Sequence, residues 1–388
     1  MVVDPKQQRH GQRDQETAGE SRIRAEHVGS LLRPAELRQA RERYDAGSLS
    51  AGDLRSIEDR EIARAVAMQR EVGLRSVTDG ELRRLYWHFD FLGGLAGVRM
   101  SREQAAIPGS AARTAGFVHR HRLAIVGPIA WQRHQFVDDF RLLAEHAGDA
   151  IARQTIPSPS FLHFRFGSQA VAAGIYGDLE AVAADLARAY AGAVRDFGAA
   201  GCRYLQFDDT TFAMMCDSKQ VEQATTAGIY RPELPRRYAD VINTAIADRP
   251  AGMRIGIHLC RGNFRSTWVA SGGYEPVADL LFNAINADVY FLEYDSDRAG
   301  GFEPLRFLPP GGKTVVLGIV TSKNGTLESK DLIKRRIEEA ARYAPLEQLA
   351  LSPQCGFTSS EEGNTLTEDQ QWAKLRLCVE VAREVWGD

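Results

Sequence analysis

Cysteine is scarce in this chain, and long apolar segments are missing. The 388 residues include five cysteines, an odd number scattered along the sequence. A long chain with so few cysteines does not match a disulfide-stapled scaffold, so we expect reduced thiols and a cytoplasmic protein. No uninterrupted apolar run approaches the roughly 18 residues that a membrane-spanning helix needs, which argues against a membrane protein.

The chain also lacks an excess of charge of one sign. It has 48 Lys plus Arg against 51 Asp plus Glu, which gives a formal net charge of -3. A protein that binds nucleic acid through a broad basic surface would carry a clear excess of Lys and Arg. The near balance therefore excludes nucleic acid as an expected partner.

Residues 1–22 contain no Leu, Ile, Phe, Tyr or Trp. They lack the apolar stretch of a signal peptide. They also offer too little apolar surface to offset the entropy that is lost when a chain becomes ordered. We therefore predict a disordered tail over residues 1–22 and one folded domain over residues 23–388.

After residue 22, short apolar runs alternate with longer segments whose apolar residues recur at helical spacing. This alternation is typical of a parallel sheet covered by helices. Eight or nine such units in roughly 360 residues are too many for a small doubly wound sheet, so we predict an α/β fold, a (β/α)8 TIM barrel with insertions. The expected strands are 75–78, 123–126, 152–156, 204–207, 254–258, 289–292, 314–317 and 349–351, and the expected helices include 57–72, 179–197, 235–247, 330–343 and 368–385.

One expected strand has to lie outside the barrel. Residues 28–30 raise the number of candidate strands to nine, one more than a barrel of this type holds. Residues 123–126 follow the polar sequence VHRHR, so we expect them to belong to a separate hairpin. No glycine-rich dinucleotide fingerprint follows the early strands, which disfavours a nicotinamide-binding domain.

Local signals mark the ends of several expected helices. Asp331 and Thr367 have side chains that can accept hydrogen bonds from the free N–H groups of a first helical turn. Gly73 and Gly198 can adopt the left-handed conformation that ends many helices. We therefore expect helices to begin next to the first pair and to end at the second.

Polar residues gather at the carboxyl ends of the expected strands, where barrel enzymes place their reactive groups. His258 and Cys260 end one strand, and residues two apart in a strand point to the same side. Glu293 and Cys355 end two other strands, and closure of the barrel would bring them to the same rim. Two thiolates and one imidazole suit zinc, and a carboxylate can complete a tetrahedron. A lone His-x-Cys pair is more often packing than a metal site, so the hypothesis depends on all four residues.

Seven sequence blocks give a further signal: AEHVGSLLRP (25–34), SVTDGELRR (76–84), YLQFDD (204–209), HLCRGNF (258–264), FLEYDSDRAG (291–300), VLGIVTSKNGTLES (316–329) and LSPQCGF (351–357). In this order and spacing they resemble the short, single-barrel members of the cobalamin-independent methionine synthase family. The similarity extends from about residue 23 to the C-terminus. Full-length members carry an additional N-terminal barrel, for which this chain is too short.

The resemblance implies a Zn²⁺ ion held by His258, Cys260, Glu293 and Cys355. It also implies a small-molecule thiol that joins the zinc as a thiolate. A free thiol has a pKa of about 8.5 and is hardly ionised at neutral pH, whereas zinc binding deprotonates it. The expected reaction is attack of this sulfur on a methyl group of a donor such as 5-methyltetrahydrofolate, which gives methionine when the thiol is homocysteine.

The resemblance also implies how the amino-acid part of the thiol is held. Gly29 and Ser30 match the loop that holds the substrate's carboxylate in the family. Glu81 and Asp208 match carboxylates that hold its amino group, and Asp208 is our candidate catalytic residue. His163 follows another expected strand among several Phe residues, where it either contacts the substrate or packs against the aromatic rings.

The sequence departs from the family at the expected proton donor. The leaving nitrogen of a folate donor needs a proton, so a general acid is required. In the family a His in the loop after the strand that matches residues 315–318 has this role. This chain reads VTSK (320–323) there, and Lys323 would be a poor acid at pH 7 because an ordinary lysine has a pKa of about 10.4. Either another group donates the proton, or the methyl donor is not a folate.

Three alternatives stay open. The first is zinc-dependent alkylation of another thiol, such as the opening of an epoxide by coenzyme M, although Glu81 and Asp208 favour an amino-acid thiol. The second is a metal-free barrel that resembles the uroporphyrinogen decarboxylases, against which the four ligand-type residues argue. The third is a non-catalytic zinc- or thiol-binding protein. The sequence does not decide the oligomeric state: the amphipathic outer helices permit a homodimer, and a partner protein that delivers the methyl donor is equally open.

Overall fold

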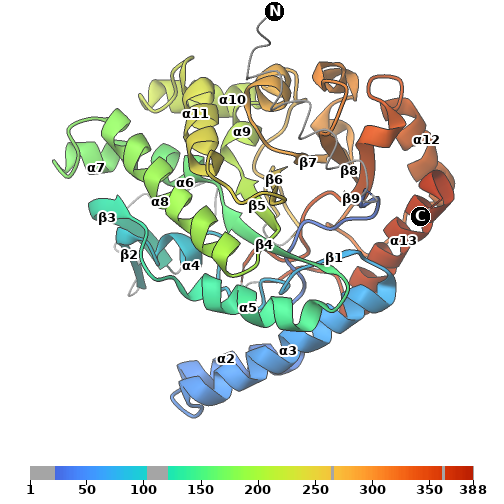
Figure 1. Cartoon of the computed structure of the whole chain (residues 1–388), viewed down its shortest axis with the longest axis horizontal. Coiled ribbons are helices and arrows are strands. Elements are labelled where there is room, and N and C mark those ends of the chain that lie inside the picture. Colours follow the sequence, from blue (N-terminus) through green and yellow to red (C-terminus); the bar gives the residue numbers. More distant parts are fainter. Residues whose placement is uncertain (1–21, 103–120, 264–265, 361–362, 388) are drawn as a thin grey trace, which may run out of the picture.

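The structure is a computed structural model that describes residues 22–102, 121–263, 266–360 and 363–387. Seven strands form one parallel sheet in the order β1-β4-β5-β6-β7-β8-β9, and Figure 1 shows helices arranged around this sheet. The predicted barrel architecture is confirmed, whereas the predicted tail lies outside the described residues except for Arg22. The strands of the large sheet are β1 (Ser76–Val77), β4 (Ile151–Pro157), β5 (Tyr204–Asp209), β6 (Arg254–Leu259), β7 (Val289–Glu293), β8 (Thr314–Val320) and β9 (Leu349–Pro353).

The segment before the first helix occupies the eighth position of the barrel, between β9 and β1. Ala25 forms a parallel bridge with Leu351 of β9. Further along the same segment, the Leu31 N–H donates to the Gly80 carbonyl, which follows β1, at 2.9 Å. The bridge therefore forms earlier than the expected strand at residues 28–30. That expectation is wrong because residues 28–30 make no ladder with a neighbouring strand in the described chain.

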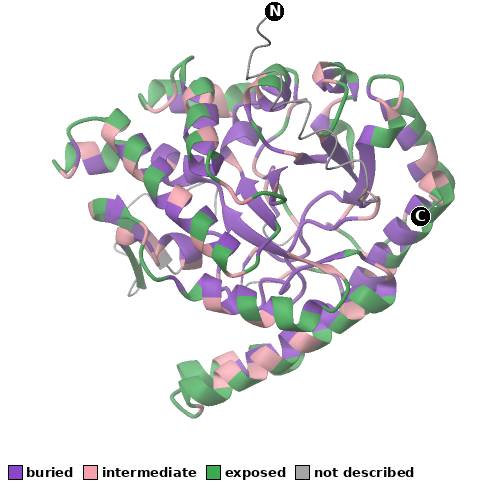
Figure 2. Ribbon diagram, in the orientation of Figure 1, coloured by how far each residue is buried: buried purple, intermediate pink, exposed green. Residues whose placement is uncertain are grey.

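Helices cover the outer face of the sheet. Figure 2 shows that the strands are buried almost throughout, while the helices are exposed on their outer faces. The amphipathic spacing in the sequence therefore places the apolar faces against the barrel, as expected for a parallel sheet. The longer helices are α2 (Ala35–Asp45), α3 (Ala51–Val72), α5 (Gln135–Ala147), α8 (Leu179–Ala199), α10 (Ser218–Thr226), α11 (Leu234–Ile246), α12 (Lys330–Ala340) and α13 (Glu368–Trp386).

Shorter helical segments lie mostly in the loops at the carboxyl ends of the strands. They lengthen these loops, which carry the site in a barrel of this type. They are α4 (Phe89–Leu92), α6 (Pro159–Leu162), α7 (Ser168–Ala172), α9 (Thr211–Met214), the π-helical segments η1 (His163–Gly167) and η2 (Leu280–Ala284), and the 3₁₀ segments η3 (Asp297–Ala299), η4 (Glu303–Phe307) and η5 (Leu346–Gln348).

Two of the expected helix ends are confirmed. Thr367 caps α13: its side chain accepts from the Gln370 N–H, and the Gln370 side chain accepts from the Thr367 N–H in return. Gly73 ends α3 in the left-handed conformation with φ 101°. Thr367 acts through its side-chain oxygen, and Gly73 acts through a backbone conformation that glycine adopts easily.

The other two expected helix ends are wrong. α12 begins after Ser329, whose hydroxyl accepts from Leu332 N–H, so Asp331 lies inside the first turn. α8 continues through Gly198 to Ala199. A Cβ atom at Gly198 would lie 2.4 Å from the Pro250 side chain, so close packing, not helix termination, accounts for this glycine.

A separate antiparallel hairpin lies outside the barrel. It consists of β2 (Ala96–Arg102) and β3 (His121–Ala130). β3 includes residues 123–126, so the expectation that this strand stands apart from the barrel is confirmed. Among the residues that the structure describes, none of the helices offers the apolar length that a bilayer crossing requires.

Candidate metal centre and substrate site

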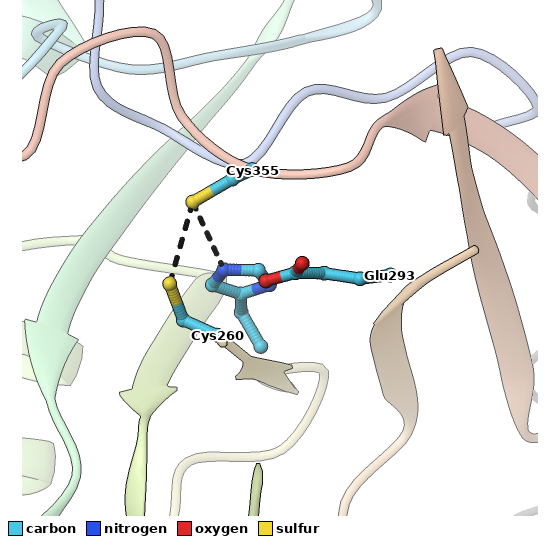
Figure 3. A group of neighbouring side chains, drawn as sticks. Cys260, Glu293 and Cys355 are labelled. Carbon is cyan, nitrogen blue, oxygen red and sulfur yellow. Dashed lines mark hydrogen bonds between the residues drawn. The ribbon is translucent and has the colours of Figure 1, made fainter. Parts of the chain in front are cut away.

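Four side chains with metal-binding atoms meet at the carboxyl ends of three strands. His258, Cys260, Glu293 and Cys355 each place one ligand atom within 4.8 Å of those of the other three. Cys355 Sγ lies 3.4 Å from Cys260 Sγ and 3.7 Å from His258 Nε2 (Figure 3). In a tetrahedral zinc site, two sulfurs lie about 3.8 Å apart and a sulfur and a nitrogen about 3.6 Å apart, as follows from the usual bond lengths. The arrangement therefore fits a metal ion of this kind.

The parallel register explains why these residues meet. β6 and β7 pair His258 with Phe291 and Leu259 with Leu292, so the next residues along, Cys260 and Glu293, stand side by side. Cys355 follows the end of β9, on the far side of β8. The curvature of the barrel brings it back to β6, and no local sequence feature could do this.

The hydrogen bond between the two thiols moves their pKa values in opposite directions. The hydrogen bond from Cys355 lowers the pKa of Cys260, and the same hydrogen bond raises the pKa of Cys355. Burial acts to lower the pKa of His258, but the hydrogen bond to Cys260 and the charge of Cys260 outweigh burial, so the pKa of His258 is raised. Burial also raises the pKa of Glu293. Such a cluster of buried groups, whose anionic forms are mutually unfavourable, suits a dication that would stabilise all of them.

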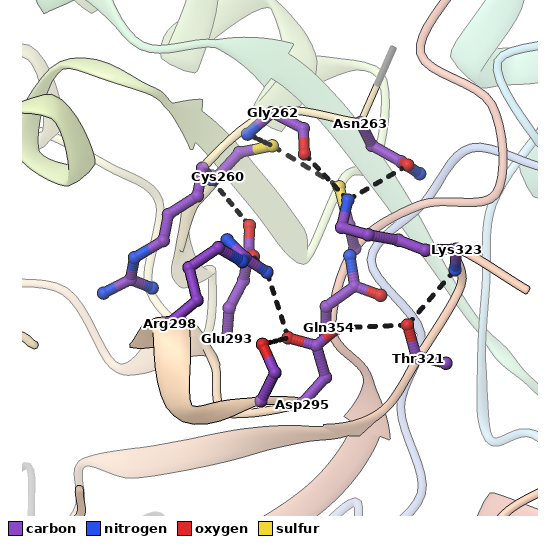
Figure 4. Close-up of polar contacts among 12 residues, drawn as sticks. Cys260, Gly262, Asn263, Glu293, Asp295, Arg298, Thr321, Lys323 and Gln354 are labelled. Atoms are coloured by element: carbon purple, nitrogen blue, oxygen red, sulfur yellow. Dashed lines mark hydrogen bonds and ion pairs between the residues drawn. The ribbon is translucent and has the colours of Figure 1, made fainter. Parts of the chain in front are cut away.

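Glu293 is fixed by donors on both of its carboxylate oxygens (Figure 4). The Arg261 backbone N–H donates to Oε1 at 2.6 Å, and Arg298 Nη2 donates to Oε2 at 3.2 Å. The same Arg298 nitrogen donates to Asp295 at 3.1 Å. Arg298 and Asp295 were not among the site residues expected from the sequence, although both lie in the block FLEYDSDRAG.

Lys323 holds the loop that begins at Cys260. Its Nζ donates to the Gly262 carbonyl at 3.0 Å, to Asn263 Oδ1 at 3.2 Å and to the Thr267 carbonyl at 3.4 Å (Figure 4). These three acceptors match the three donors of an ammonium group. Lys323 therefore ties the loop after β8 to the loop after β6.

A pair of acidic side chains forms a polar compartment beside the metal ligands. Asp208 pairs with His258 in the β5–β6 register. Burial, followed by the charge of Glu81, raises the pKa of Asp208 to about 7. Glu81 Oε1 accepts from the Thr155 hydroxyl at 2.8 Å, whereas Glu81 Oε2 is buried and has no hydrogen-bond partner in the described chain. Two such carboxylates with spare acceptor capacity form a site for a cationic group, such as an ammonium.

Backbone conformation also marks this compartment. Glu81 has a φ of 57°, which is rare for a residue with a side chain and is common at functional sites. Gly29 has a φ of 144°, and a Cβ atom there would lie 2.8 Å from Thr155 and 3.3 Å from Glu81 Oε1. Only glycine therefore fits where this loop passes the Glu81 carboxylate.

Ser30 lies between this compartment and the loop that carries Cys355. A Cβ atom on Gly356 would lie 2.0 Å from Ser30 Oγ, and the Phe357 N–H donates to the Ser30 carbonyl at 2.9 Å. The Ser30 side chain is buried. The segments around Ser30, Glu81, Asp208 and Cys355 thus converge on the same rim of the barrel.

His163 makes its hydrogen bonds within the protein. Its Nδ1 lies 3.0 Å from the Tyr238 hydroxyl and its Nε2 lies 3.1 Å from the Leu179 carbonyl. The Tyr238 ring meets it edge-on. These contacts favour the packing interpretation over substrate contact, and a substrate-binding role for His163 stays a prediction.

An aromatic cavity lies next to Cys260, which forms part of its wall. It encloses about 910 Å³ of space between the side chains, part of it open to solvent. The segment YWHF (86–89) forms much of its wall and is anchored to the chain after Cys355, because the Trp87 N–H donates to the Ser359 carbonyl at 3.0 Å. This cavity was not expected from the sequence, although the four consecutive ring-bearing residues 86–89 were a signal for it. The cavity is lined by Tyr86, Trp87, His88, Phe89, Phe161, Arg165, Phe166, Thr210, Met214, Cys260, Arg261, Gly262, Asn263, Val269, Ala270, Ser359 and Ser360.

Comparison with known proteins places this geometry in a family. The family model described as the catalytic domain of cobalamin-independent synthase matches residues 170–384. The match includes Asp208 and the four candidate metal ligands, while Gly29, Ser30 and Glu81 lie before it.

Full-length relatives extend the similarity to nearly the whole chain. The uncharacterized protein YxjH of Bacillus subtilis (strain 168) is 47% identical over 365 residues, which are 94% of this chain and 95% of YxjH. A candidate vitamin B12-independent methionine synthase of known structure, from Listeria monocytogenes, is 39% identical with a TM-score of 0.75 and covers 95% of this chain and 100% of its own.

A more distant structure shows the same fold. The B12-independent methionine synthase from Shewanella sp. W3-18-1, solved in complex with selenomethionine, is 19% identical with a TM-score of 0.69 and covers 94% of this chain and 98% of its own. The family model and the relatives of higher identity show that the chain belongs to the cobalamin-independent methionine synthase family.

Proposed function

We propose that this protein is a zinc-dependent methyltransferase that transfers a methyl group from 5-methyltetrahydrofolate or another donor to the sulfur of homocysteine or a similar thiol, giving methionine. The observation on which this rests is the position of the four metal-binding side chains. They border both the compartment with two carboxylates and the cavity with aromatic walls. Asp208 neighbours His258 on one side, and Cys260 forms part of the cavity wall on the other.

The residues at the rim match zinc in type and in spacing. His258, Cys260, Glu293 and Cys355 provide one nitrogen, two sulfurs and one oxygen within 4.8 Å. Zinc bound there would supply the positive charge that keeps an incoming thiol in its nucleophilic, deprotonated form. Arg298 and the Arg261 N–H orient the Glu293 carboxylate, as supporting groups commonly do around metal ligands.

The polar compartment supports an amino-acid thiol as the acceptor. The free Oε2 of Glu81 and the carboxylate of Asp208 are placed to accept hydrogen bonds from an ammonium group. Ser30 would donate its hydroxyl to the substrate's carboxylate, as the family resemblance implies. A sulfonate in this compartment would be repelled by the same two carboxylates, so homocysteine is favoured over an acceptor such as coenzyme M.

The aromatic cavity supports a methyl donor that approaches from the side opposite to the amino-acid compartment. Its ring-bearing walls offer apolar surface on which such a donor could pack. The sulfur lone pair then forms the new bond to the methyl carbon, and the departing group of the donor keeps the electron pair of the broken bond. This requires the acceptor to be held by Glu81 and Asp208 while the donor occupies the cavity.

The metal ligands also bear on the cellular compartment. Cys260 and Cys355 have their sulfurs 3.4 Å apart, so an oxidising environment would favour a disulfide over a metal site. We therefore place the working protein in the cytoplasm, where thiols stay reduced.

Metal analysis is the first test. Purified protein should contain one zinc per chain, and His258→Ala and Cys260→Ser should lose it. Matched controls are His146→Ala, on the exposed face of α5, and Cys378→Ala, in α13. Zinc retained by both ligand variants would show that the metal is elsewhere.

Activity is the second test. Zinc-loaded protein is incubated with homocysteine and with a panel of methyl donors: methyl-folates with and without additional glutamates, methylcobalamin and small methylated compounds. We expect methionine, detected by mass spectrometry, with at least one donor. If no donor gives methionine and homocysteine leaves the zinc X-ray absorption spectrum unchanged, the proposed function is wrong.

A further inference from the structure

A buried carboxamide connects two parts of the polar compartment. Gln206 lies in β5, two residues before Asp208, so the two side chains point to the same side of the sheet. Gln206 Nε2 donates to Asp208 Oδ1 at 2.6 Å and to the Val28 carbonyl at 2.7 Å. Val28 directly precedes Gly29 and Ser30. One side chain therefore holds both the Asp208 carboxylate and the loop that contains Ser30.

The direction of this carboxamide is fixed by Arg153 of β4. Arg153 Nη1 donates to Gln206 Oε1 at 2.9 Å, and a guanidinium has donors but no acceptor. The amide oxygen of Gln206 must therefore face Arg153, and its two N–H groups must face Asp208 and Val28. A rotated amide would set its oxygen against two other acceptors and its N–H groups against the guanidinium.

Arg153 is anchored to the same N-terminal segment that the carboxamide holds. Its Nη2 donates to the His27 carbonyl, and its Nη1 lies 3.5 Å from Glu26 Oε2. The Phe291 ring centre lies 5.0 Å from the guanidinium carbon, and both Arg153 and Gln206 are fully buried. Such a network permits few other arrangements, because each lost hydrogen bond would leave a buried polar group without a partner.

The network determines which oxygen of Asp208 is available to a ligand. Oδ1 accepts from Gln206, whereas no residue that the structure describes donates a hydrogen bond to Oδ2. The hydrogen bond at Oδ1 opposes rotation of the carboxylate, so Oδ2 keeps one direction. Hydrogen bonds weaken steeply when they are misaligned, so an ammonium shared by Asp208 and Glu81 depends on this direction.

We propose that Gln206 is a positioning residue for the thiol acceptor: its carboxamide, oriented by Arg153, sets Asp208 in the direction that binds the acceptor's ammonium group. This inference rests on the proposed function for the identity of the acceptor. It adds that the preference for an amino-acid thiol depends on a residue that acts through Asp208, since the oxygen and both N–H groups of Gln206 are engaged within the protein.

The binding test compares two thiols that differ in one group. Homocysteine has an ammonium group, and 4-mercaptobutanoate is the same acid without it. Their affinities for the zinc-loaded, full-length protein are measured by calorimetric titration with a thiol-free reductant. We expect the wild type to prefer homocysteine and Gln206→Met to reduce this preference about 10-fold, because the ammonium-bearing thiol alone uses Asp208. Part of the preference should remain, since Glu81 is unchanged.

Two further variants separate positioning from damage to the fold. Gln348→Met is the matched control: Gln348 is also buried and bridges two backbone carbonyls, but it precedes β9, at the end of the barrel away from the metal ligands. It should keep the wild-type preference even where it lowers stability. Gln206→Glu keeps the size and an acceptor for Arg153, but its carboxylate has no N–H donors. It should lose the preference as Gln206→Met does, and it decides the case if Gln206→Met does not fold.

The outcomes distinguish this inference from the proposed function. If the wild type prefers homocysteine and the Gln206 variants keep the full preference, Gln206 has no positioning role while the proposed function stands. Equal weakening of both thiols, with an unchanged ratio of affinities, would show a general structural role and would also overturn the inference. If the wild type binds the two thiols equally well, the amino-acid acceptor of the proposed function is wrong, and the inference fails with it.

Kinetics provide a second measure. With an active methyl donor, Gln206→Glu should raise the KM for homocysteine about 10-fold and leave the KM for the donor unchanged, because the contacts of Gln206 lie in the acceptor's compartment. An equal rise in both KM values would mean that the substitution disturbs the whole rim, and an unchanged KM for homocysteine would mean that Asp208 is held without Gln206. Either result would overturn the proposal.

Discussion

At the scale of single residues, Asp208 links the substrate compartment to the pH dependence of folding. Burial, followed by the charge of Glu81, raises the pKa of Asp208 to about 7, whereas an unfolded Asp titrates near about 3.9. Between these values the folded chain binds more protons than the unfolded chain. The contribution of Asp208 to the free energy of unfolding is therefore fully present below about pH 4 and is lost as the pH rises to about 7.

Asp208→Asn should remove this contribution. For the metal-free protein, we expect the wild type to lose up to about 1.4 kcal/mol of unfolding free energy per pH unit through this group between about pH 4 and pH 7. The variant should show a correspondingly flatter profile and a higher stability at pH 8. Urea unfolding at pH 5 and pH 8 measures both, and Asp248→Asn, an exposed position, serves as the control. An unchanged slope in Asp208→Asn would assign the pH dependence to other groups.

Lys323 is the second residue whose role can be isolated. It ties Gly262, Asn263 and Thr267 to the loop after β8, and Cys260 begins the tied segment. We expect Lys323→Met to weaken zinc binding about 10- to 100-fold, as is usual when a support of a metal ligand is removed. Competition with a coloured chelator measures the affinity.

The matched control for Lys323 is Lys334→Met. Lys334 lies in α12 and pairs with Glu384 on the surface, so its loss should leave zinc affinity unchanged. Equal affinities in the wild type and Lys323→Met would mean that the loop is held without the lysine.

At the scale of elements, α13 depends on a cap that is local in sequence. Thr367 and Gln370 satisfy each other's backbone N–H groups at its start, and α13 packs against the barrel near β9. We expect Thr367→Ala to lower the free energy of unfolding by about 1 kcal/mol. Urea unfolding at a single pH measures the change.

A threonine that does not cap a helix start provides the comparison for Thr367. Thr226 is exposed at the end of α10, and its hydroxyl donates to the Glu222 carbonyl. Thr226→Ala should have little effect or a slight stabilising effect, because Ala has the higher helix propensity. A loss in Thr226→Ala as large as that in Thr367→Ala would argue against the cap as the cause.

At the scale of the whole molecule, the metal ligands connect strands that are far apart in the chain. β6, β7 and β9 supply one side of the rim, and zinc bound by the native state alone would stabilise that state by mass action. At free zinc of 1,000 times Kd the expected gain is about 4 kcal/mol. Calorimetry of chelator-treated wild type should therefore show a Tm that rises on addition of zinc, with no such rise in His258→Ala. A similar rise in both proteins would place the stabilising zinc elsewhere.

The sequence alone determined much of this account, because the relevant signals are local. The alternation of side chains in strands placed His258 and Cys260 on one side, and the position of Glu293 at a strand end directed it to the same rim. Thr367 and Gly73 marked helix ends because each acts on its own backbone. The order of the strands followed from the alternation of apolar runs and amphipathic helices.

Tertiary structure decided the features that depend on neighbours distant in sequence. Residues 28–30 look like a strand in the sequence. The bridge to β9 is nevertheless made earlier, because Ala25 pairs with Leu351. Gly198 is required by Pro250, which lies far along the chain. The aromatic cavity and the raised pKa of Asp208 both arise from side chains that meet only when the barrel closes. Burial and charge act through space, so their effects could not be predicted from residues along a line.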